Sequence, residues 1–250
     1  MRIAFLLFGI VGYTHKYGAF ESVDGGIPID VGMCAENYKK MVFNSHKVDV
    51  FIHTWSTKFE KSLKRMYPVM GGIFQPQIKF DVHKYPADSR KDRFVELSRW
   101  YSTKKVIELQ HKYSIDNNIQ YDFIMLSRFD MLWSTPVAFE ELEKDKLYIP
   151  NWNDWGYRID DIPRKSNHSN PFGKKMSLYQ DMWIIGNQEH MQHISTLYDR
   201  VDKHTGPKHS PHQFLFIHLD KYRRTDSIRF KYHYGIDYNL YRRAVLKNWM

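Results

Sequence analysis

The chain has 250 residues, and its 37 Lys and Arg against 28 Asp and Glu leave a net charge of +9. Hydrophobic residues make up 42% of the chain and aromatic residues 16%, which is enough for a packed core and argues against a mainly disordered protein. The single cysteine, Cys34, excludes an intrachain disulfide and any metal site that needs several cysteines.

The chain opens with an apolar stretch that predicts a buried strand over residues 2–8, ending at Gly9. Residues 10–31 carry several glycines and no periodicity, so they predict a long loop, which in a compact domain is usually functional or mobile. A helix over 32–45 and a second apolar strand over 48–53 follow. We expect Cys34 to be a buried structural thiol of that helix rather than a nucleophile.

Helices and strands continue to alternate along the rest of the chain. Helices are predicted over residues 56–67, 92–113, 188–203, 211–219 and 241–250, and strands over 78–83, 121–127, 147–149, 181–186 and 228–234. A polar loop is predicted over 150–177. Repeated strand–helix units predict an α/β fold, a mostly parallel sheet with helices on both faces, in one domain.

The N-terminal stretch has the apolarity of a signal peptide, but it is short and has no clear cleavage site. No other segment approaches the roughly 20 apolar residues of a membrane span. We therefore expect a soluble, cytoplasmic protein. The positive charge favours anionic partners, but no zinc-finger spacing or aromatic RNA-binding motif accompanies it, so nucleic acid is not an expected partner.

The most informative stretch is residues 121–133, where an apolar run of strand length ends in Arg128 and Asp130. In α/β proteins ligands sit at the carboxyl ends of the strands, so these charges are expected to face a site. A carboxylate there suits Mg²⁺ or Mn²⁺, and arginine offers a planar fork to phosphate oxygens. A plain Arg–Asp ion pair at a strand end is an equal alternative.

On these features the chain resembles nucleotide-sugar-dependent glycosyltransferases of the GT-A fold, most of all the small transferases of surface-polysaccharide clusters and large DNA viruses. The resembling segments are residues 2–9, Asp49-Val-Phe-Ile-His-Thr-Trp55, the Tyr-Asp and Ser-Arg-Phe-Asp motifs of 121–130, and Tyr179-Gln-Asp-Met-Trp-Ile-Ile-Gly186. The resemblance implies a Rossmann-like half over 1–133 that binds a nucleoside diphosphate sugar, and an elaborated half over 134–250 that binds the acceptor.

The implied activity is transfer of a sugar to a glycan or a lipid-linked acceptor, in the cytoplasm of a host cell if the source is viral. A lipid-linked acceptor and the positive charge together would suit peripheral contact with a membrane. GT-A enzymes usually hold Mn²⁺ or Mg²⁺ with Asp-x-Asp after the central strand. Here the first position is Arg128, so only Asp130 matches as a metal ligand, and Arg128 is an alternative source of positive charge for the diphosphate.

The predicted donor-binding residues lie at strand ends and on the helix before the fourth strand: Phe8, Gly9, Trp55, Ser102, Lys105, Arg128 and Asp130. Gly9 would let a nucleotide approach the backbone, and Trp55 would stack on the base or flank the ribose. In similar enzymes the helix that carries Ser102 and Lys105 passes close to the nucleotide. A core aromatic and a solvated helix face are the respective alternatives.

The acceptor side is assigned to Asp181 and to two residues of the polar loop. Asp181 is predicted to act as general base on an acceptor hydroxyl, its pKa raised by partial desolvation, and a strand-capping Asp is the equal alternative. Asp154 and Trp155 are predicted to bind acceptor sugar, since sugar rings stack on aromatics and carboxylates accept hydrogen bonds from hydroxyls. An ordinary exposed loop is the slightly favoured alternative for either residue alone. The competing function is a carbohydrate- or nucleotide-binding module without turnover, which the missing first Asp of the metal motif favours.

Overall fold

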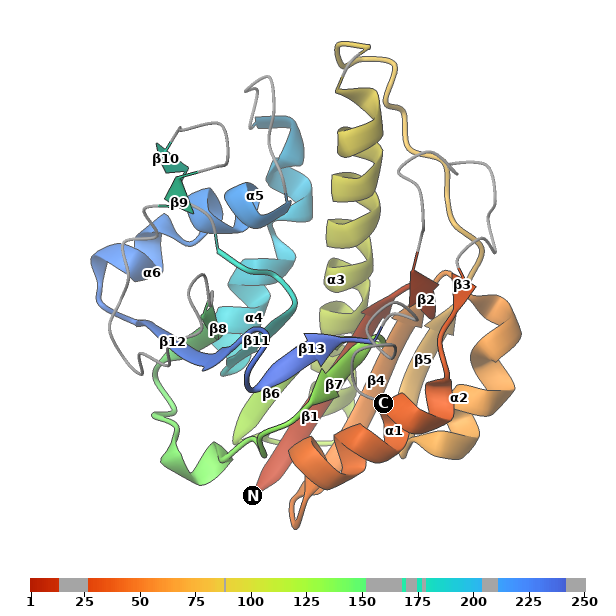
Figure 1. Ribbon diagram of the computed structural model, residues 1–250, viewed down its shortest axis with the longest axis vertical. Helices are drawn as coiled ribbons and strands as arrows, with labels where there is room; N and C mark the ends of the chain where they lie inside the picture. The colour runs from red at the N-terminus through yellow and green to blue at the C-terminus, as the bar shows by residue number, and fades with distance from the viewer. Residues whose placement is uncertain are drawn as a thin grey trace.

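The computed structural model describes residues 1–13, 27–87, 89–151, 168–169, 175–176, 179–203 and 211–241. These residues form a seven-stranded sheet of order β12-β8-β11-β6-β1-β4-β5 (Figure 1). Its strands are β1 (Arg2–Gly9), β4 (Lys47–Thr54), β5 (Val69–Phe74), β6 (Phe123–Arg128), β8 (Leu147–Asn151), β11 (Trp183–Gly186) and β12 (Ile228–His233). All neighbouring strands are parallel except β11, which runs antiparallel to both β6 and β8.

The remaining elements are six α-helices, four short helical turns and three two-stranded pairs within the described residues. The α-helices are α1 (Val31–Tyr38), α2 (Glu60–Met66), α3 (Arg90–Asp116), α4 (Gln188–Ser195), α5 (Pro211–His218) and α6 (Asp220–Arg224). A π-helical turn spans Lys39–Phe43, and 3-10 turns span Thr57–Phe59, Phe139–Glu141 and Tyr198–Lys203. The pairs are β2 (Gly12–Tyr13) with β3 (Ile27–Pro28), β7 (Met131–Trp133) with β13 (Tyr238–Leu240), and β9 (His168–Ser169) with β10 (Lys175–Met176).

Strand β1 shows why the sheet is covered on both sides. Successive side chains of a strand point to opposite faces. Phe5 and Leu7 pack in one buried cluster with Tyr38 of α1, whereas Leu6 packs in a second cluster with Trp100 of α3. Figure 1 accordingly shows α1 and α2 on one face and α3 and α4 on the other. Both faces need apolar side chains, so the strand is a continuous apolar run.

The α/β architecture with a mostly parallel sheet and helices on both faces is therefore confirmed. The predicted strand over residues 78–83 is wrong, because that segment has no regular structure and the third parallel strand is β5. Gly71 and Gly72 concealed β5, since glycine is normally depleted in strands. A Cβ at Gly71 would lie 3.3 Å from the side chain of Leu109, so close packing of α3 favours glycine here.

Two further predictions need correction or lie outside the described residues. Residues 188–203 form α4 and a separate 3-10 turn rather than one helix. Most of the predicted loop over 150–177, and the predicted helix over 241–250 beyond its first residue, lie outside the described residues. Within the described part of the chain, no helix is both long and apolar enough to cross a membrane.

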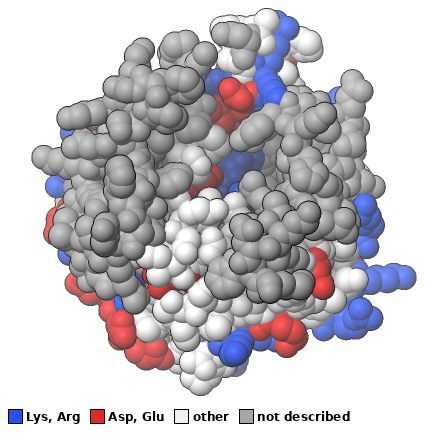
Figure 2. All heavy atoms as spheres, in the orientation of Figure 1, with Lys and Arg blue, Asp and Glu red and all other residues white. Residues whose placement is uncertain are grey.

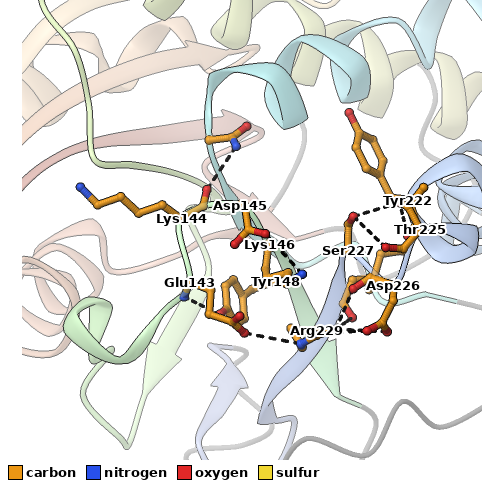
Figure 3. Close-up of polar contacts among 12 residues, drawn as sticks. Glu143, Lys144, Asp145, Lys146, Tyr148, Tyr222, Thr225, Asp226, Ser227 and Arg229 are labelled. Carbon is orange, nitrogen blue, oxygen red and sulfur yellow. Dashed lines mark hydrogen bonds and ion pairs between the residues drawn. The ribbon is translucent and has the colours of Figure 1, made fainter.

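Polar contacts connect the β12 edge of the sheet to the turn before it and to the segment before β8 (Figure 3). Arg229 Nε lies 3.6 Å from Glu143 Oε1, and Arg229 Nη1 lies 3.3 Å from Asp226 Oδ1. The backbone N–H of Glu143 donates to the hydroxyl of Tyr148 at 2.7 Å. Charged side chains on an edge strand also discourage pairing with another chain.

Candidate functional site

The candidate site lies at the carboxyl ends of β1 and β6, where the order of the sheet reverses. The chain runs from β1 outward through β4 to β5 and then returns to place β6 on the other side of β1. In open α/β sheets, ligands bind beyond the strand ends at such a switch point. Phe8 is paired with Arg128 across these two strands, and Gly9 follows directly. The structure thus brings together Phe8, Gly9, Arg128 and Asp130, four of the predicted donor-binding residues.

Arg128 and Asp130 form a two-pronged ion pair. Arg128 Nε donates to Asp130 Oδ1 and Nη2 donates to Oδ2, both at 2.7 Å. The Asp130 side chain is 2% exposed, whereas that of Arg128 is 30% exposed. Burial acts to lower the pKa of Arg128, but the Asp130 carboxylate outweighs it and the pKa lies above its usual value. The accessible member of the pair is therefore the cation.

A second ion pair adjoins the first and joins α3, α5 and Asp181, which lies two residues before β11. Arg99 Nε donates to Asp181 Oδ2 at 2.8 Å, and Arg99 Nη2 donates to the Asp181 carbonyl. His212 Nδ1 lies 3.0 Å from Asp181 Oδ1. The Arg99 guanidinium carbon lies 3.6 Å from the centre of the Phe8 ring, which connects this pair to β1. Sequence reasoning missed Arg99 and His212; the only available signal for Arg99 was its place one turn before Ser102.

The electrostatic surroundings of Asp181 differ from the prediction. Burial acts to raise its pKa, but Arg99 and His212 outweigh burial and hold the pKa well below the usual range of a carboxyl group. The predicted raised pKa is therefore wrong, because two cations from distant parts of the chain lie beside Asp181 and outweigh its desolvation. A carboxylate held this strongly is a weak proton acceptor, so the geometry favours an anchoring role for Asp181.

The two ion pairs influence one another. Burial lowers the pKa of Arg99 to about 10, with Asp181 opposing burial and Arg128 lowering it further. Asp181 in turn contributes to the raised pKa of Arg128. Figure 2 shows basic and acidic atoms together in a hollow near the centre of this face. We refer to Arg99, Arg128, Asp130 and Asp181 as the strand-end charge cluster.

Ser102 has a structural position rather than an exposed one. Its Oγ accepts the backbone N–H of Gly9 at 2.9 Å and lies 2.7 Å from His53 Nδ1. Ser102 and His53 are fully buried, and burial lowers the pKa of His53 to about 4. The predicted donor contact by Ser102 is corrected accordingly: its hydroxyl fastens the ends of β1 and β4 to α3.

Trp55 is likewise buried, at 1% exposure, and its ring stacks on Tyr101 with centroids 5.5 Å apart. The predicted stacking on a base or ribose is corrected, because the core already covers this ring. Lys105 lies on the outer part of α3 with its Nζ 2.9 Å from Glu108 Oε2. Its role as a donor contact stays a prediction.

Two local features shape the backbone at the switch point. Gly9 has a φ of +96°, which glycine adopts without strain, and among the described residues no atom lies within 4 Å of where its Cβ would be. The Tyr38 hydroxyl donates to the carbonyl of Arg128 at 2.5 Å and lies 2.9 Å from Ser127 Oγ. Helix α1 therefore fixes the end of β6.

Cys34 of the same helix is buried, and burial raises its pKa to about 12, as expected of a structural thiol.

The predicted acceptor residues Asp154 and Trp155 lie outside the described residues. The predicted metal ligand Asp130 can be tested for fit. Both its oxygens already accept from Arg128, and no group of three or more His, Cys, Asp or Glu that could hold a metal occurs among the described residues. These residues do not fit Mn²⁺ or Mg²⁺ as they stand.

No protein-family model matches this sequence, and no curated protein matches it.

Proposed function

We propose that this protein is a glycosyltransferase of the GT-A type that transfers a sugar from a nucleoside diphosphate sugar to a hydroxyl of a glycan or lipid-linked acceptor. The observation that carries the proposal is the position of Arg128 and Asp130, beside the open backbone of Gly9 at the switch point of the sheet. That position is where α/β sheets bind ligands with phosphate groups.

The chemistry of sugar transfer suits this arrangement. The glycosidic bond to the diphosphate breaks, and the leaving diphosphate gains negative charge that must be stabilised. Arg128 presents a partly exposed guanidinium at that point, and Asp130 fixes its plane with two hydrogen bonds of 2.7 Å. Preorganised donors of this kind stabilise developing charge without reorganising. No step of the proposal passes through a metal ion.

The experiment is a turnover assay with a panel of nucleoside diphosphate sugars, with release of the nucleoside diphosphate as the readout. We expect one donor to be consumed by the wild type, and Asp130→Ala to abolish the reaction while keeping a native circular dichroism spectrum. Asp226→Asn, which neutralises an exposed carboxylate far from the strand-end charge cluster and keeps a residue type that tolerates the positive φ of this position, is the control. Wild-type turnover in folded Asp130→Ala would reject the site.

One observation favours a second function, a nucleotide- or carbohydrate-binding module without turnover. Asp181, the carboxylate predicted to act as base, is held ionised by Arg99 and His212. A module would bind a donor and raise its own melting temperature with no consumption of the donor. Binding without turnover across the panel, with and without candidate acceptors, would select this function over the transferase.

A further inference from the structure

Arg128 keeps donors available after its pairing with Asp130. A guanidinium has five N–H groups, and the two bonds to Asp130 use only one from Nε and one from Nη2. The side chain is 30% exposed, so part of it stays accessible beside the buried Asp130. An arginine fork in this state can still bind a phosphate oxygen.

Arg99 supplies a second donor nearby, since its guanidinium lies over the ring of Phe8, the residue paired with Arg128. Its Nη1 is buried and has no hydrogen-bond partner among the described residues, and its side chain is only 11% exposed. An unsatisfied N–H on a buried cation is costly, so it points to an oxygen that comes from outside the described residues. The ring of Phe8 and the bonds to Asp181 fix the guanidinium, so this donor is already oriented.

Asp130 does not offer the free oxygens that a divalent cation needs. A cation at Asp130 would first have to displace Arg128 from both carboxylate oxygens. Separating a largely buried ion pair is strongly unfavourable, because it leaves a buried charge uncompensated. An anion that approaches Arg128 from its exposed edge meets no such cost, because the pair with Asp130 stays intact.

We infer that Arg99 and Arg128 form an oxyanion site that binds the diphosphate of the donor directly, without a divalent cation. The inference rests on the proposed function for the identity of the ligand, whereas the site itself rests on the two guanidinium groups. Arg128 binds the anion through the N–H groups that Asp130 leaves free, and Arg99 binds it through its buried Nη1. Asp130 and Asp181 act as positioning residues that orient the two guanidinium groups.

The test is calorimetric titration of the full chain with inorganic pyrophosphate in the presence of EDTA. We expect binding in EDTA that excess Mg²⁺ does not strengthen. The substitutions Arg128→Lys and Arg99→Lys keep the charge but lose the planar fork, and we expect each to weaken binding by about tenfold. The control is Arg90→Lys on α3, the helix that carries Arg99. Its guanidinium donates to the backbone carbonyls of residues 83 and 85, and the affinity of this variant for pyrophosphate should be unchanged.

Three results would overturn the inference: binding that needs Mg²⁺, wild-type affinity in both cluster variants, or an equal loss in Arg90→Lys. Melting curves show whether each variant is folded. If a variant is not folded, titration of the wild type with pyrophosphate, with and without Mg²⁺, still decides the question. Sugar transfer that depends on Mn²⁺, with no pyrophosphate binding in EDTA, would keep the proposed function and reject the oxyanion site. Pyrophosphate binding in EDTA without turnover of any donor would keep the site and reject the transferase.

Discussion

At the scale of single residues, the pairing of charges decides which groups change protonation near neutral pH. Asp181 stays ionised because Arg99 and His212 outweigh its burial. For His212, burial acts to lower the pKa, but Asp181 outweighs burial and the pKa is raised above its ordinary value of 6.5. His212, the cationic partner of Asp181, is therefore expected to stay protonated to a higher pH than an isolated histidine.

This shift predicts a pH-dependent contribution of His212 to stability. A group whose folded pKa is raised contributes fully below its unfolded pKa and loses that contribution as the pH rises through the folded value. We therefore expect His212→Gln to lower the free energy of unfolding more at a pH below 6.5 than at pH values well above it. Urea unfolding of both proteins at the two pH values measures the difference.

The control for His212 is His83→Gln, which removes an exposed histidine. We expect this control to change the free energy of unfolding little at either pH, because its side chain is solvated. An equal loss for His212→Gln at both pH values would mean that lost packing, rather than the ion pair with Asp181, explains the effect.

At the scale of elements, α4 shows a cap that the sequence pattern indicates only in part. The side chain of Asn187 accepts the backbone N–H of His190 at 3.0 Å, and the Asn187 N–H donates back to His190 Nδ1 at 3.3 Å. The second bond needs a neutral ring, and burial lowers the pKa of His190, which favours that form. Asn before a helix is a common cap, but a histidine in the reciprocal position is unusual.

We expect Asn187→Ala to lower the free energy of unfolding by about 0.5–2 kcal/mol, because the first turn of α4 loses its side-chain acceptor. Asn187→Ser should retain most of the stability, since serine caps helices about as well. Chemical denaturation of the three proteins measures both effects. If alanine and serine cost the same, the bond from Asn187 Nδ2 to the Lys144 carbonyl would be the important one instead.

At the scale of the whole molecule, the two predicted halves share one sheet and both of its hydrophobic clusters. Strand β6 of residues 1–133 pairs with β11 of residues 134–250. The rings of Trp133 and Trp183 meet across this seam with centroids 5.6 Å apart. Each of the two hydrophobic clusters contains residues from both halves. Separating the halves would expose apolar residues of both clusters to water.

We therefore expect the chain to unfold in a single cooperative transition. Urea transitions followed by tryptophan fluorescence and by far-ultraviolet circular dichroism should coincide, because Trp55 and Trp100 report on the first half and Trp183 on the second. Two separated transitions would show that the donor and acceptor halves are independent folding units despite their shared sheet.

The periodicity of the sequence was sufficient for the class of fold and for most of its elements. Continuous apolar runs such as β1 are characteristic of strands buried on both faces, and the spacing within α3 is that of a long helix against a sheet. The sequence did not predict strand β5 because Gly71 and Gly72 lower its strand propensity, although Gly71 allows the close packing of Leu109. Local preference carries no information about such long-range contacts.

The sequence by itself determined that Arg128 and Asp130 end a buried strand, because an apolar run followed by charge is a local signal. Only the tertiary structure decided how these charges are used. It placed Arg99 and Phe8 beside them, paired Asp181 with two cations, and buried Trp55 and Ser102 that the sequence had assigned to a ligand. Ion pairing and burial depend on residues far apart in the chain, and a pKa depends on both.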